Sequence, residues 1–156
     1  MSGTVKRASD IEWESVRKPF HYTLKLNPGE VFAFHEDVLP QYLGKTVKVT
    51  NAHFNAQDGF RTDGYLYGDG ICHLASLINW AARTAQLSVV SKVNHDFADI
   101  PGIAREYGTS IYYFPGANAG NAQQNLYIEN TLKQIVYIDF HYDEKAMLTV
   151  TIYTLF

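Results

Sequence analysis

The sequence predicts an α+β fold, in which one main helix (about residues 70–86) packs on a mostly antiparallel β-sheet that ends in a C-terminal β-hairpin. Three observations carry this prediction. Apolar residues recur with helical spacing in one segment, and several short segments alternate between apolar and polar residues. Aromatic residues reach 14% of the chain, with 11 Tyr and 9 Phe, and such tyrosine richness favours strands.

Composition limits the class of protein. The chain has 156 residues, of which 46% are hydrophobic and 19% charged, so we expect one globular domain over residues 20–156 behind an N-terminal arm over residues 1–19. A net charge of −3 without a Lys/Arg stripe argues against nucleic acid as a partner. No apolar run reaches the roughly 18 residues that a membrane span needs, and the start lacks a signal peptide's apolar stretch.

The predicted strands follow from alternation and from the turn residues between them. "HYTLKL" and "EVFAFH" flank "NPG" as a hairpin or a strand–turn–strand unit, and "TVKVTNAHF", "LSVVSKV", "TSIYYF" and "NLYIEN" are further strands. "NAQDGFRTDGYLYGDG" and "PGANAGNAQQ" are predicted loops because glycine, Asp and Asn dominate them.

The helix is the strongest periodic signal. Its apolar residues fall at i, i+3, i+4 and i+7 spacing and predict one buried stripe: Ile71, Leu74, Ala75, Ile78, Ala81, Ala82 and Ala85. Asp69 occupies the expected N-cap position, and we expect the helix to end near Gln86.

The C-terminal hairpin is predicted from two alternating runs around Asp143 and Glu144. One face should be apolar and the other solvated. The apolar face joins Val136, Ile138 and Phe140 to Leu148, Val150 and Ile152, and the solvated face carries Tyr137, Asp139, His141, Thr149, Thr151 and Tyr153.

The segment "GDGICHLASLINWAARTAQL" resembles the VanW family, whose members have a glycine-rich turn, Ile/Val-Cys-Gln and a helix of this type. Upstream, "NPGEVFAFHEDVLP" is similar to that family's "PGE-FSF" segment. Downstream, "NHDF" is similar to its Asn-His-Ser motif, and "NLYIENTLKQIVYI" to its closing strand pair. The resemblance covers roughly residues 20–140 in the family's order. Three positions depart from the family pattern, namely His73, Asp96 and Ser110.

This resemblance indicates the cellular context of the protein rather than a specific reaction. The family is named from glycopeptide-resistance gene clusters, and its members often stand beside peptidoglycan-binding modules in envelope proteins. It therefore implies a cell-envelope or extracellular location and a cell-wall peptide or glycan as partner. We expect no cofactor.

Cys72 is the only cysteine in the chain, so an intrachain disulfide and CxxC-type sites are excluded. Near a helix N-terminus, the dipole favours a thiolate and therefore a stronger nucleophile. His95 follows the next predicted strand and could return to the helix start as the base. The group that orients the imidazole stays open among Asp96, Asp99, Asp139, Asn94 and Asn130, with Asp96 in the preferred set of Cys72, His95 and Asp96.

Binding of substrate is assigned to groups around this thiol. Cys72 shares one side of the helix with Ser76, Asn79 and Arg83, so we expect that side to line a groove. Candidate substrate contacts are Tyr65, Tyr67, Gly70, His73 and Ser76. Backbone N–H groups of "GYLYGDG" could form an oxyanion hole, although plain loop geometry, with glycines supplying a positive φ, is the favoured interpretation.

Three functions remain open from the sequence. The first is a cysteine-dependent hydrolase or acyl transferase acting on peptidoglycan-type amides. The second is a binding module that uses the same groove without turnover, and the third is a structural domain with a packed, inert Cys72. A zinc site from Cys72, His73 and His95 is not expected, because their spacing matches no zinc signature. The other histidines, His21, His35, His53 and His141, are expected to be ordinary, half-exposed residues.

Overall fold

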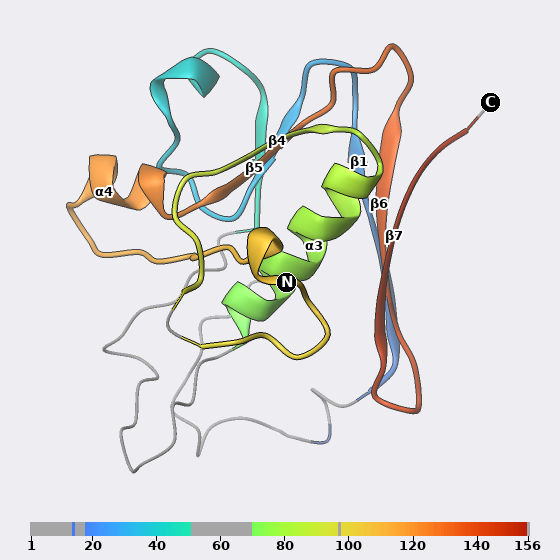
Figure 1. Cartoon of the computed structure of the whole chain (residues 1–156). Helices are drawn as coiled ribbons and strands as arrows, with labels where there is room; N and C mark the ends of the chain where they lie inside the picture. Colours follow the sequence, from blue (N-terminus) through green and yellow to red (C-terminus); the bar gives the residue numbers. More distant parts are fainter. Residues whose placement is uncertain (1–13, 15–17, 51–69, 97, 156) are drawn as a thin grey trace.

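The structure is a computed structural model that describes residue 14 and residues 18–50, 70–96 and 98–155. Within these residues, two β-sheets flank one long helix, α3 (Ile71–Thr84), which lies between them (Figure 1). The predicted α+β class, the main helix, and the C-terminal hairpin are all confirmed.

Sheet A has three antiparallel strands in the order β1-β6-β7, with bounds β1 Phe20–Leu26, β6 Val136–Tyr142 and β7 Leu148–Thr154. In β6–β7, Ile138 pairs with Ile152 and Phe140 with Val150, so these residues share one face as predicted. These side chains pack toward α3, because alternate residues of a strand point to opposite faces. The other face of sheet A is polar and largely exposed.

Sheet B has four strands in the order β3-β2-β5-β4, with bounds β2 Val31–Ala33, β3 Val47–Val49, β4 Ser88–Ser91 and β5 Leu126–Glu129. Only the pairing of β2 with β3 is parallel. Because β1 and β2 belong to different sheets, the "NPG" turn joins a strand–turn–strand unit and not a hairpin.

The core lies where α3 meets both sheets. Ala75, Ile78 and Ala82 of the predicted stripe are buried in it, and Ile71 and Leu74 pack against its border. A second cluster on the far side of sheet B includes Leu39, Tyr42 of the 3-10 turn η2 (Pro40–Tyr42), and Ala122 of α4 (Asn118–Gln123). Among the described residues, sheet B is therefore covered on both faces, whereas sheet A is covered on one.

The predicted cap of the main helix is wrong. The N-cap residue is Gly70, with a left-handed φ of 78° and no side-chain cap hydrogen bond. Glycine reaches this conformation without the Cβ clash that other residues meet. The helix ends at Thr84, and Gln86 adopts φ 58° while the Leu87 N–H donates to the Ala82 carbonyl, which is a Schellman-type ending.

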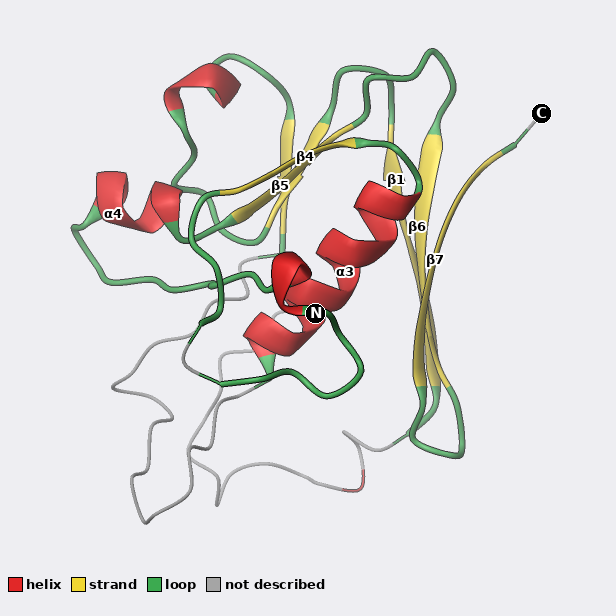
Figure 2. Ribbon diagram, in the orientation of Figure 1, coloured by secondary structure: helices red, strands yellow, loops and turns green. Residues whose placement is uncertain are grey.

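Two other segments differ from the prediction. "TSIYYF" is extended but belongs to neither sheet (Figure 2), because its backbone bonds to side chains of α3 and to the loop after β4 instead of to a strand. "PGANAGNAQQ" contains the short helix α4. The loop predicted over residues 55–70 lies outside the described residues, apart from Gly70.

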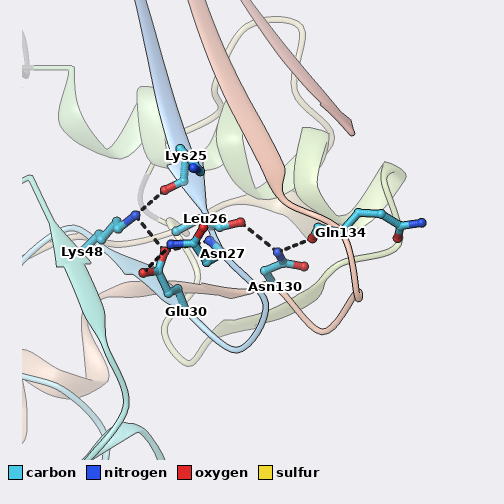
Figure 3. A network of polar contacts seen from close by, with 7 residues as sticks. All are labelled: Lys25, Leu26, Asn27, Glu30, Lys48, Asn130 and Gln134. Carbon is cyan, nitrogen blue, oxygen red and sulfur yellow. Dashed lines mark hydrogen bonds and ion pairs between the residues drawn. The ribbon is translucent and has the colours of Figure 1, made fainter. Parts of the chain in front are cut away.

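A polar network ties the two sheets together where β1 leaves sheet A (Figure 3). Fully buried Asn130 donates through Nδ2 to the carbonyl oxygens of Leu26 and Gln134, each at 2.9 Å. The Glu30 carboxylate accepts from the Asn27 backbone N–H at 2.7 Å and pairs with Lys48 at 2.7 Å. These bonds fix the relative placement of the strands that α3 packs against.

Candidate functional site

The polar side of α3 is covered by backbone. Ser76 Oγ accepts the Thr109 N–H at 2.9 Å and donates to the Cys72 carbonyl at 2.7 Å. Asn79 Nδ2 donates to the Tyr107 carbonyl at 2.9 Å and to Thr109 Oγ1 at 3.0 Å. Both side chains are buried, at 0% and 1% exposure. The prediction of a groove along this side is therefore wrong. From Ser76 to Asn79, this side of the helix packs against the segment around Thr109.

Cys72 lies one turn before Ser76, toward the start of α3, and is half-buried against the core. With Gly70 as N-cap, it is the second helical residue and not the third. Its Sγ accepts the Ile111 N–H at 3.5 Å and lies 3.7 Å from the Ile111 carbonyl oxygen. The N–H and the positive end of the helix dipole both favour a thiolate, whereas the carbonyl favours the neutral thiol.

His95 returns to the first turn of α3, as the predicted path of the chain requires. Its ring meets the His73 ring edge to face, with centroids 5.9 Å apart, and it is only 6% exposed. Its Nδ1 lies 3.1 Å from the Ala98 carbonyl oxygen. A carbonyl can only accept, so Nδ1 carries a proton, and in the neutral tautomer Nε2 is the basic nitrogen.

Four of the five side chains proposed to orient His95 are engaged elsewhere. Asp96 is exposed and pairs with Arg105 at 3.2 Å, Asn94 donates to the Arg105 carbonyl at 2.9 Å, and Asn130 belongs to the network of Figure 3. The fourth, Asp139, lies on sheet A with His21, and the fifth, Asp99, is exposed. A backbone carbonyl, that of Ala98, is the group that the structure places on Nδ1.

The residues predicted to contact substrate fall into three groups. Gly70 and His73 are exposed at the start of α3, and Ser76 is buried beneath Thr109. Tyr65 and Tyr67 lie outside the described residues. Sequence reasoning missed the backbone groups of Ala98 and Ile111, since a backbone carbonyl or N–H leaves no signature in residue type.

His35 was predicted to be half-exposed, and this is wrong. It is 2% exposed, with Nε2 3.2 Å from the Gln124 carbonyl and Nδ1 3.3 Å from Asn125 Nδ2. The carbonyl requires a proton on Nε2 and the amide a lone pair on Nδ1, so these contacts select the neutral tautomer. This fixed, neutral ring serves the packing of the loops around Asn125.

Within the described residues, no three or more His, Cys, Asp or Glu side chains are arranged to hold a metal ion. None of the helices in that part of the chain is long and apolar enough to cross a membrane.

Comparison with known proteins adds one match. Residues 21–153 match the family model described as VanW like protein. The chain belongs to the VanW-like protein family. The comparison with curated proteins gave no match, and neither did the comparison with solved structures.

The segments that carry the VanW resemblance meet in space in two groups. The "PGE" turn and β2 lie beside β5 in sheet B. The Cys72 turn and the "NHD" segment meet through the rings of His73 and His95. The second group places the thiol turn and the buried imidazole of this VanW-like chain at one end of α3.

Proposed function

We propose that this VanW-like chain is a cysteine-dependent amide hydrolase or acyl transferase that acts on peptidoglycan-type peptides. The observation that supports this proposal is that His95 lies against the helical turn that contains Cys72, through the ring contact with His73. The Ala98 carbonyl holds Nδ1 of His95. A nucleophile at a helix start, with an imidazole fixed by a third group, is the arrangement that such chemistry needs.

The reaction divides between the two side chains. His95 Nε2 takes the thiol proton, and Cys72 Sγ adds to the amide carbonyl carbon of the substrate. The C–N bond then breaks, the amine leaves with the proton from His95, and a thioester remains on Cys72. Water hydrolyses the thioester in a hydrolase, whereas an acceptor amine takes the acyl group in a transferase.

The substrate class and the location rest on family membership. VanW-like proteins are associated with the cell envelope, where stem peptides supply abundant amide bonds. The proposal therefore places the protein in the envelope or outside the cell, with residues 20–156 as one domain and residues 1–19 as an arm.

A second candidate function is favoured by the thiol contacts themselves. Sγ packs against the core and approaches the Ile111 carbonyl at 3.7 Å, as an inert, neutral thiol would. In that case the chain is a non-catalytic module that binds a cell-wall peptide or glycan, or a structural domain of an envelope protein.

The rate of iodoacetamide alkylation against pH separates the two. The catalytic proposal expects a midpoint clearly below the free-cysteine pKa of about 8.5, and His95→Ala should shift that midpoint. His141→Ala is the matched control, since His141 lies on the exposed face of sheet A and should leave it unchanged. Labelling only after unfolding would refute catalysis.

Turnover is tested on peptidoglycan fragments with the wild-type chain and Cys72→Ser. The expected result is release of new amino groups by the wild type alone. A low thiol pKa with binding but no release in either chain would favour the binding module.

A further inference from the structure

The open face of sheet A brings together two histidines that are far apart in the sequence. In the antiparallel pairing of β1 with β6, His21 lies directly opposite His141. Both residues are exposed, and their ring centroids are 5.9 Å apart. Thr149 of β7 continues the same row on the far side of His141.

A charged carboxylate lies in the next row. Asp139 Oδ1 is 2.7 Å from His21 Nε2 and accepts the Thr23 hydroxyl at 2.6 Å. The two imidazoles thus stand beside a fixed negative charge on an otherwise open surface.

The spacing of the rings suits a shared metal ion. A Zn–N bond is about 2.0–2.1 Å, so the centre of a coordinated imidazole lies about 3.2 Å from the ion. Two such rings are about 5.2 Å apart at the tetrahedral angle and at most about 6.4 Å apart. The observed 5.9 Å lies between these limits, so rotation of two exposed side chains suffices to aim their nitrogens at one point.

We propose that His21 and His141 chelate a divalent transition-metal ion of the zinc type on this face, with the Asp139 carboxylate beside it. Imidazole donors suit Zn²⁺, Cu²⁺ and Ni²⁺, whereas Mg²⁺ and Ca²⁺ take oxygen ligands. Since no three described side chains converge on one ion, water completes the coordination and the metal exchanges readily. The site is separate from Cys72 and does not rest on the function proposed above.

Zinc titration followed by calorimetry tests the proposal. The chain should carry no affinity tag and should have Cys72→Ala, so that the thiol takes no zinc, at about pH 7.5, where free imidazole is neutral. One saturable site is expected. His21→Ala and His141→Ala should each weaken binding about tenfold or more, because either change leaves a single donor. Thr149→Ala, in the same row, should leave the affinity within about twofold.

A second measurement does not depend on the Cys72 substitution. In the wild-type chain, zinc should shift the imidazole ¹⁵N signals of His21 and His141 together. Affinity that survives either histidine change, shifts confined to His73 and His95, or no saturation below millimolar zinc would each overturn the proposal.

Discussion

Asn130 should be one of the polar side chains on which the fold depends most. It is 0% exposed, and its amide group makes three bonds: Nδ2 donates to the Leu26 and Gln134 carbonyls at 2.9 Å each, and Oδ1 accepts the Leu132 N–H at 3.0 Å. The perturbation is Asn130→Ala, which removes all three bonds.

The magnitude follows from which partners stay buried. Leu26 is 0% exposed, so its carbonyl loses a partner that water cannot replace, at about 1–3 kcal/mol. Leu132 and Gln134 are exposed residues whose backbone groups can bond to water, so each lost bond costs about 0.5–1 kcal/mol. The free energy of unfolding should therefore fall by about 2–5 kcal/mol.

Urea unfolding followed by circular dichroism measures this loss. With a slope of about 2 kcal/mol per molar urea, the midpoint should fall by about 1–2.5 M. Gln134→Ala is the matched control, because the bond from Asn130 goes to the backbone carbonyl of Gln134 and not to its side chain. The free energy of unfolding of this variant should stay within about 0.5 kcal/mol of wild type. Equal midpoints for the two variants would refute the reasoning.

Three further predictions concern the C-terminal end of α3, the ion pair of Glu30, and the contact between Ser76 and Thr109. Gln86→Gly should raise stability by about 0.5–1 kcal/mol in thermal unfolding, because φ is 58° there; a loss would contradict the left-handed ending. Lys48 and the Asn27 bonds lower the pKa of Glu30 to about 2. The stabilisation of the fold by the charged Glu30 carboxylate is therefore full above about pH 4.5 and is lost as the pH falls toward 2. Glu30→Gln should be about 1–2 kcal/mol less stable at neutral pH and equal to wild type near pH 2; a pH-independent difference would contradict this. Ser76→Ala should cost about 1–3 kcal/mol and speed hydrogen exchange at Thr109, whose buried N–H loses its acceptor; unchanged exchange would contradict it.

Controls for these changes come from the same elements. Thr84→Gly, in the last helical turn, should lower stability by about 0.3–0.5 kcal/mol where Gln86→Gly raises it, since Thr84 has helical backbone. Lys145→Gln, in the exposed β6–β7 turn, should leave the acid dependence of unfolding unchanged. Hydrogen exchange at Asn121, which bonds to the Ala117 carbonyl, should not respond to Ser76→Ala.

The sequence by itself determined the elements whose signals are local. The 3.6-residue period fixes which face of α3 is buried, so Ala75, Ile78 and Ala82 were predictable. Two-residue alternation around one turn sets the β6–β7 register in the same way. The ordered motifs also identified the family.

Only the tertiary structure decided what covers each polar surface. The polar side of α3 predicts solvent exposure from its residue types, yet Ser76 and Asn79 are buried, because the backbone around Thr109 satisfies their hydrogen bonds. Likewise, His21 meets His141 only through the long-range pairing of β1 with β6. Periodicity reports a residue's neighbours along one element, whereas contacts between distant segments depend on packing that no local pattern encodes.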